Sequence, residues 1–159
     1  MARITVTHRH GESFDIRVRG YALISDEPIT LGGDDEGPTP TELMVAGLAA
    51  CAADEVVRCL AAIGEKFEPT EIGGDFAWDA EGGRVASIRL SVTLPCELSA
   101  STREKVLKAM LSCPARKMLA EPPSVDYKFE SVEVPASVAP AVDGGGWPEE
   151  PPPDVDSEG

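Results

Sequence analysis

Thr39-Pro40-Thr41-Glu42, followed by LMVAGLAACAA (residues 43–53), is the stretch that decides the fold, because it carries the clearest helix signal in the chain. Thr39 is a favourable N-cap, Pro40 suits the first helical position, and Glu42 completes a capping box three residues after the cap. Gly64 is a natural C-terminal stop. The pattern therefore predicts a helix that runs from the Thr39 cap to Gly64.

The first half of this predicted helix is apolar on every face, whereas its second half carries Asp54, Glu55 and Arg58. A helix without a polar stripe must be buried all round. In so small a domain, complete burial indicates that a second subunit covers one side. We therefore expect a homodimer.

The rest of the chain reads as strands, one further helix and loops. Apolar and polar residues alternate with period two in five segments, which predicts an antiparallel meander and a hairpin. These segments are residues 3–8, 13–18, 21–25, 71–79 and 84–94. A second capping box, Ser101-x-x-Glu104, predicts a helix that Pro114 interrupts, and a last strand is expected at about 125–134. The order of elements indicates an α+β fold with antiparallel sheets packed against helices.

Charge and length restrict the partners. The formal net charge of the 159 residues is -14, which argues against nucleic acid and anionic membrane as partners. The N-terminus has no signal-peptide pattern, and the longest uncharged apolar stretch is too short for a membrane span of roughly 20 residues. We expect a cytoplasmic protein whose cysteines are thiols, with no cofactor and no metal.

The C-terminal residues 136–159 differ in composition from the rest. They hold six acidic residues, five Pro and four Gly, with no Lys or Arg. Such a segment cannot bury enough apolar surface to offset its chain entropy. We therefore expect a domain over residues 1–135 and a disordered acidic tail over 136–159, which either solubilises the chain or docks through Trp147.

Two of the four cysteines are candidates for chemistry. Cys51 lies within the apolar helix, where a passive buried thiol is the simpler interpretation. Cys113 precedes Pro114 and so is predicted at a helix N-terminus, with Arg116 and Lys117 nearby. Backbone amides and these cations would favour a thiolate there. The local sequence alone therefore makes Cys113 the better thiolate of the two.

These residues resemble a known family. The stretch GPTPTELMVAGLAAC (residues 37–51) and the stretch SCPARKML (residues 112–119) are similar to the two cysteine signatures of the osmotically inducible protein C (OsmC) and organic hydroperoxide resistance family. The two cysteines stand 62 residues apart, as in the family layout. The resemblance covers residues 1–135 and implies an intertwined homodimer with antiparallel sheets wrapped around two central helices.

The resemblance also implies an activity, that of a thiol-dependent peroxidase in oxidative stress defence. Cys51 would attack an organic hydroperoxide and become a sulfenic acid, and Cys113 would resolve it as a disulfide. An external dithiol, such as a lipoylated protein, would restore the pair. Leu43, Met44, Gly47 and Leu48 are the residues expected to form an apolar pocket.

Two departures from the family pattern concern the groups that would activate the thiol. The family places an Arg in the first hairpin, held by a Glu ten residues before the first cysteine. Arg9 is the candidate for the Arg, with Arg17 and Arg19 as alternatives, but Thr41 stands where the Glu is expected. The alternative function is therefore a non-catalytic dimeric protein that binds an apolar or thiol-containing small ligand.

Overall fold

The long helix forms where the capping box predicts it. The computed structural model describes residues 3–131 of the chain, and helix α1 spans Pro40–Ala62. The Thr39 hydroxyl accepts a hydrogen bond from the Glu42 N–H at 3.2 Å, and the Glu42 carboxylate accepts one from the Thr39 N–H at 2.8 Å. Both halves of the capping box are therefore present, and α1 ends just before Gly64.

The first three predicted strands form one antiparallel sheet of order β1-β2-β3. Strand β1 is Ile4–His10, β2 is Ser13–Val18 and β3 is Tyr21–Ser25. A bulge between His8 and His10 shifts the register where β1 turns into β2. After β3 the chain forms a loop that contains a short 3-10 helix, η1 (Ile29–Leu31), and leads into α1.

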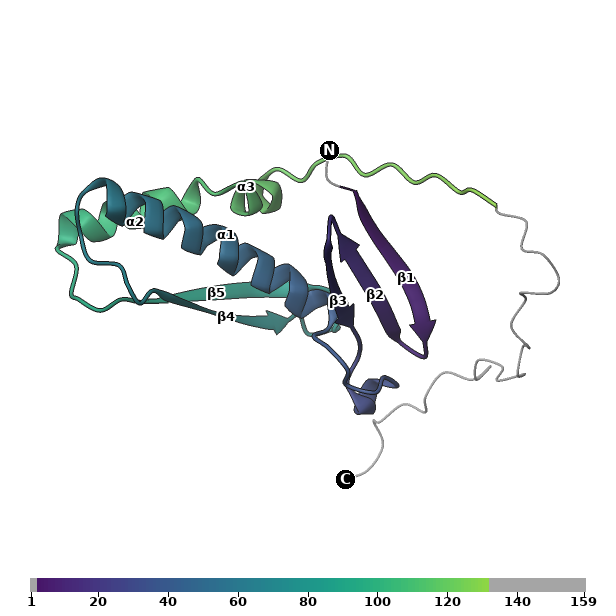
Figure 1. The fold of residues 1–159 in the computed structure, drawn as a ribbon. Helices are drawn as coiled ribbons and strands as arrows, with labels where there is room; N and C mark the ends of the chain where they lie inside the picture. Colours follow the sequence, from purple (N-terminus) through teal and green to yellow (C-terminus); the bar gives the residue numbers. More distant parts are fainter. Residues whose placement is uncertain (1–2, 132–159) are drawn as a thin grey trace, which may run out of the picture. The chain divides into compact units, whose positions relative to one another are not determined.

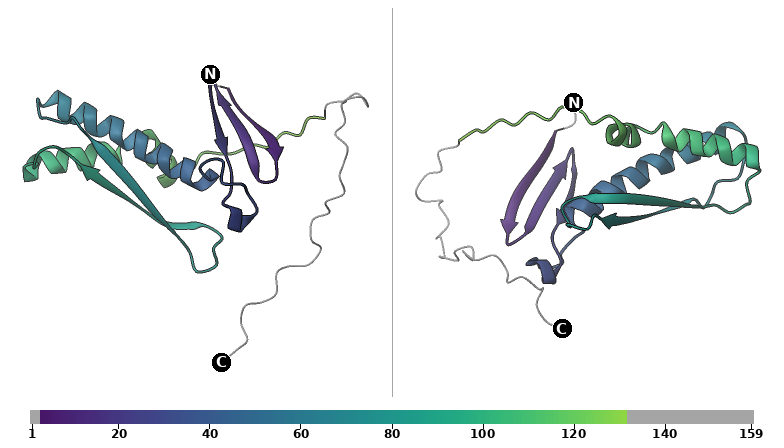
Figure 2. Two further views of the ribbon diagram at one scale, coloured as in Figure 1. Left: turned by 60° about the horizontal axis from the view of Figure 1, so that its bottom comes forward. Right: turned by 180° about the vertical axis from the view of Figure 1, so that it is seen from behind.

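The predicted hairpin forms the second sheet, in which β4 (Glu71–Trp78) pairs antiparallel with β5 (Val85–Thr93). Figure 1 shows α1 running beside this hairpin, and α1 contacts β4 directly. Helix α2 (Ala100–Leu111) and helix α3 (Pro114–Ala120) follow, and both contact α1. Figure 2 shows α2 lying along α1 in two further views. The α+β class with antiparallel sheets is thus confirmed.

The start of α2 corrects one expectation. Its N-cap is Ser99, whose hydroxyl accepts from the Thr102 N–H at 3.1 Å, and not Ser101. The helix therefore begins before the capping box that we expected at Ser101 and Glu104. The Ser99 hydroxyl also contacts the Thr102 hydroxyl at 2.9 Å, so the earlier serine satisfies more polar groups than the later one.

The described part of the last expected strand is not a strand. The chain divides into two units, Met1–Pro123 and Ser124–Gly159, and residues 124–131 of the second are without regular structure. A strand needs a neighbour for its N–H and C=O groups, and no described segment pairs with this one. The remainder of that expected strand, the boundary after residue 135 and the tail over 136–159 lie outside the described residues.

The core is built from one face of α1. Val56 and Leu60 are completely buried and meet Val106 of α2, with apolar side chains from the hairpin and the adjoining loops around them. Met44, in the first half of α1, is 63% exposed in the single chain, so complete burial of this half would need the second subunit that we expect. Within residues 3–131, the covered side of α1 is the one that faces the hairpin, α2 and α3.

Candidate active site

Cys51 lies in the middle of α1 and is half-buried. It adjoins Ala52, which is buried, and follows the buried Leu48 by three residues, so its position borders the covered side of the helix. The capping box at Thr39 sets where α1 begins. The spacing of Cys51 from the buried Leu48 and Ala52 sets which face of the helix carries the thiol.

Cys113 occupies the link between α2 and α3 and is completely buried. It is the N-cap of α3, with an extended backbone (φ -62°, ψ 145°), and Pro114 takes the first helical position. Its Sγ accepts a hydrogen bond from the Arg116 N–H at 3.3 Å. The position expected for Cys113, at the start of a helix opened by Pro114, is therefore confirmed.

The thiols of Cys51 and Cys113 are neighbours, and their environment does not favour a thiolate on Cys113. Burial raises the pKa of the Cys113 thiol above its ordinary value of 9.0, the Arg116 N–H lowers it, and the adjacent Cys51 thiol raises it again. The net direction is upward, opposite to the one that its place at a helix N-terminus predicts. Desolvation of a fully buried sulfur outweighs the nearby backbone dipoles. All four cysteines are free thiols.

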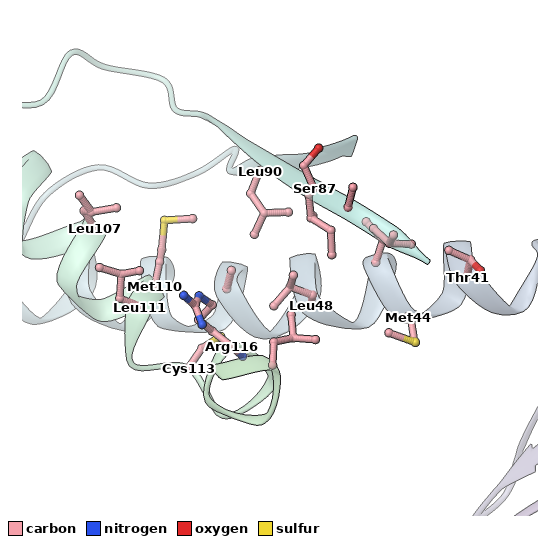
Figure 3. Close-up of a pocket in the computed structure, with 16 residues that line it drawn as sticks. Thr41, Met44, Leu48, Ser87, Leu90, Leu107, Met110, Leu111, Cys113 and Arg116 are labelled. Atoms are coloured by element: carbon pink, nitrogen blue, oxygen red, sulfur yellow. The ribbon is translucent and has the colours of Figure 1, made fainter. Parts of the chain in front are cut away.

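A cavity of about 770 Å³ opens beside Cys113 (Figure 3). Its walls come from α1, β5, α2 and α3 and are largely apolar. The apolar side chains that line it include Met44, Leu48, Ile88, Leu90, Met110 and Leu111. Of the four residues expected to form a pocket, Met44 and Leu48 line this cavity. A volume of this size suits a small organic molecule.

Polar groups are few in this cavity. In Figure 3, Thr41 lies near one end of the cavity. Cys113 and Arg116, both from the start of α3, lie together at a place farther along the cavity. Thr41, at the position expected for the family glutamate, therefore presents a hydroxyl and no carboxylate. The neighbouring Glu42 is engaged in the helix cap.

Arg9 lies near the end of β1 and is engaged by acidic side chains. Its guanidinium forms an ion pair with Glu36 and a longer one with Asp15 at 3.7 Å. It also donates a hydrogen bond to the Ser13 hydroxyl at 3.0 Å. Arg9 thus has a carboxylate partner, as the family pattern requires, but that partner is Glu36.

The loop that carries Glu36 is organised around a buried carboxylate. Asp26 is 1% exposed, and it accepts hydrogen bonds from the N–H groups of Glu27, Asp34 and Glu36 at 2.8, 3.0 and 3.1 Å. Burial alone would raise the pKa of this carboxyl, but the three backbone N–H groups hold it below 3.8. Gly33 is required here, since a Cβ on it would lie 1.9 Å from the Glu27 carbonyl oxygen. Asp26 therefore fixes the segment that presents Glu36 to Arg9.

Sequence reasoning did not identify Glu36 or the contribution of β5 to the cavity. Glu36 belongs to a run of three acidic residues in a loop, and nothing in that run distinguishes it from Asp34 or Asp35. The alternation of apolar and polar residues along β5 predicted an apolar face, but not which element would cover that face. Within the described residues, no group of three or more His, Cys, Asp or Glu side chains is placed to hold a metal ion.

The fold and the adjacent cysteines define an α+β protein with a paired-thiol site beside an apolar cavity. Residues 33–128 match the family model described as OsmC-like protein. The chain belongs to this family. No curated protein matches the chain in sequence.

Solved structures support the same fold. A protein of Psychrobacter arcticus, described as induced by osmotic stress and belonging to the detoxification response, has a TM-score of 0.68 and 22% identity, over 74% of this chain and 87% of that one. An OsmC-like protein of Mycoplasma pneumoniae gives 0.65 and 17%, over 77% and 89%. The organic hydroperoxide resistance protein OhrB of Bacillus subtilis gives 0.58 and 21%, over 77% and 92%. None of the helices in the described part of the chain is long and apolar enough to cross a membrane.

Proposed function

We propose that this protein is a thiol-dependent peroxidase that reduces organic hydroperoxides, with Cys51 as the attacking residue and Cys113 as the resolving one. The observation that carries the proposal is that the Cys113 thiol, which lines an apolar cavity, has the Cys51 thiol of α1 as its neighbour. The similarity in fold to a protein of organic hydroperoxide resistance supports the same activity.

The proposed reaction takes three steps. The Cys51 thiolate attacks the terminal oxygen of the hydroperoxide, so that an S–O bond forms, the O–O bond breaks and an alkoxide leaves, to be protonated to the alcohol. Cys113 then displaces the sulfenic hydroxyl, which forms the Cys51–Cys113 disulfide and releases water. An external dithiol reduces this disulfide and is itself oxidised to a disulfide. Lipoyl groups on a partner protein are dithiols of this kind.

The roles of the two cysteines follow from their surroundings. Since its pKa is raised, Cys113 carries a proton at neutral pH, which suits a resolving thiol. It can supply the proton that leaves with the sulfenic hydroxyl as water. The apolar walls of the cavity favour an alkyl hydroperoxide over hydrogen peroxide, because they offer few hydrogen-bonding groups. The family resemblance also implies an activating cation, for which the sequence offers Arg9 in the first hairpin.

We further propose that the working unit is a homodimer. Large apolar side chains are exposed on β1, on α1 and on the segment after Pro123. Those that alternate along the last segment are Val125, Tyr127 and Phe129, with Phe129 97% exposed. Apolar surface of this extent in one chain indicates a partner. Light scattering should give twice the mass of the chain, and a monomer would contradict this assignment.

The compartment belongs to the same proposal. Four free thiols and the need for a dithiol reductant fit a cytoplasmic role in defence against oxidative stress. Labelling of intact cells with a thiol reagent that does not cross membranes should leave these cysteines unmodified.

The test of the enzymatic proposal is consumption of cumene hydroperoxide in the presence of dihydrolipoamide. Cys51→Ser should abolish turnover, whereas Cys113→Ser should allow a single reduction and leave Cys51 as a sulfenic acid. Cys59→Ser is the matched control, because Cys59 is also half-buried on α1. Undiminished turnover by Cys51→Ser would exclude the proposal.

A second candidate function is supported by Thr41, which replaces a carboxylate at the cavity. Without the carboxylate, the site would bind an apolar or thiol-containing small molecule and carry out no reduction. This alternative predicts no peroxide consumption and a ligand-dependent rise in the thermal midpoint. A panel of aliphatic thiols and fatty acids that leaves the midpoint unchanged would argue against it.

A further inference from the structure

We propose that Arg116, carried by α3, is the cation that stabilises negative charge at the Cys51–Cys113 pair and contacts the leaving oxygen of the substrate. The inference rests on the proposed peroxidase function and adds a catalytic residue to it. It moves the activating charge from the first hairpin to the short helix that follows Cys113.

The geometry places Arg116 at the reacting groups. Its backbone N–H donates to Cys113 Sγ, and its side chain lines the same cavity as Cys113. Figure 3 shows the guanidinium beside Cys113 and directed toward α1. Because Cys113 and Arg116 line one cavity and Cys51 is the neighbour of Cys113, a substrate in this cavity would meet the guanidinium close to the thiol pair.

Arg116 is also the one charged residue among those that line this cavity in the described part of the chain. The other walls are neutral: α1 contributes Thr41 and apolar side chains, β5 contributes Ser87 and apolar ones, and α2 contributes only apolar ones. Besides Arg116, the one titratable group in the described lining is therefore the Cys113 thiol, which has Cys51 as its neighbour. Arg116 is itself exposed, so it would act by direct contact with an anion in the cavity and not through a low dielectric.

The ion pairs of the described residues leave Arg116 available. Arg9, Arg58 and Arg84 each have a carboxylate within salt-bridge distance, whereas Arg116 has none among residues 3–131. The charge of Arg9 is already balanced in part by Glu36 and Asp15. No described carboxylate balances the charge of Arg116, which lines the cavity.

The charge balance of the proposed step explains why a cation is needed here. One negative charge begins on the Cys51 sulfur and ends on the alkoxide oxygen when the O–O bond breaks. The Arg116 side chain lines the same cavity as Cys113 and can donate N–H groups to that oxygen while the charge moves. A planar guanidinium that stays protonated can do so without giving up a proton.

The experiment compares four variants: Arg116→Gln, Arg116→Lys, Lys117→Gln and Arg9→Gln. Lys117→Gln is the matched control, since it removes the same charge from the same helix but from a residue outside the cavity lining. Two rates are measured for each, that of Cys51 alkylation by iodoacetamide at neutral pH and that of Cys51 oxidation by cumene hydroperoxide. Thermal midpoints establish that each variant is folded.

We expect Arg116→Gln to slow alkylation about tenfold and oxidation about a hundredfold, Arg116→Lys to restore part of both rates, and Lys117→Gln to leave both near wild type. Unchanged alkylation in folded Arg116→Gln, or a loss seen in Arg9→Gln and not in Arg116→Gln, would overturn the inference. If the wild-type protein consumes no peroxide but Arg116→Gln still slows alkylation, the assignment of the cation stands and the peroxidase proposal fails.

Discussion

Oxidation of the Cys51–Cys113 pair should stabilise the protein by an amount that can be worked out from the fold. The bond would close a loop of 62 residues, which by chain entropy stabilises the folded state by about 4 kcal/mol. Cys113 Sγ also caps α3, and weakening that hydrogen bond on oxidation would cost about 1 kcal/mol. The net gain of about 3 kcal/mol corresponds to a rise of about 1–2 M in the urea midpoint.

The assay is urea unfolding of the reduced protein and of protein treated with one equivalent of cumene hydroperoxide, with mass spectrometry to establish the bond. Cys113→Ser is the control, since it cannot form the bond and should show no gain. If the oxidised wild-type protein carries the bond but unfolds at the same or a lower urea concentration, the two sulfurs are not placed to bond without distortion. Failure to form the bond at all would refute the proximity on which the site rests.

Three further outcomes follow from the described contacts. Because burial raises the pKa of Cys113, its alkylation in the native protein should be slow at neutral pH and increase only above about 9.0. The stability linked to this thiol is fully present below the pKa of the unfolded thiol and is lost as the pH rises through the higher folded value. Fast alkylation of Cys113 at about pH 7 would contradict this reasoning. Asp26→Asn should lower the thermal midpoint and make that midpoint fall less steeply as the pH is lowered. The reason is that the lowered pKa of Asp26 gives stability that is present above pH 3.8 and lost as the pH falls through the folded value. An unchanged dependence of the midpoint on acid pH would show that the loop does not depend on this carboxylate. Leu60→Ala should lower the free energy of unfolding by about 2–5 kcal/mol in a urea titration, since this side chain is completely buried, and a loss below about 1 kcal/mol would mean that the core closes around the deletion.

The parts of the fold that were predictable are those whose signals are local. The cap at Thr39, the proline after it and the apolar run together predicted α1, because each acts within one or two turns of helix. Strand periodicity found both sheets for the same reason. The same local reasoning placed the start of α2 at the wrong serine, since Ser99 and Ser101 differ only in contacts that the folded helix makes.

The site was predictable only in part. The two cysteine positions follow from the helix signal and from Pro114, but the direction of the Cys113 pKa depends on burial by elements distant in sequence. The ion pair between Arg9 and Glu36 joins β1 to the loop after β3, 27 residues away in sequence, and no short-range pattern predicts it. Arg116 was noted as a nearby charge, but its place in the cavity lining depends on how α3 packs against α1.

The hydrogen bonds from the N–H groups of residues 27, 34 and 36 to the Asp26 carboxylate divide the loop between β3 and α1 into two parts. One part can change in length and the other cannot. Additional residues could be accommodated at η1, where Ile29 is 75% exposed and the carboxylate makes no contact. Between Gly33 and Glu36, however, a single inserted residue would pull the chain out of reach of its anchor and carry Glu36 away from Arg9. Relatives of this protein are therefore expected to differ in length at η1, and a fluorescent or affinity tag inserted there should leave the thiol site undisturbed.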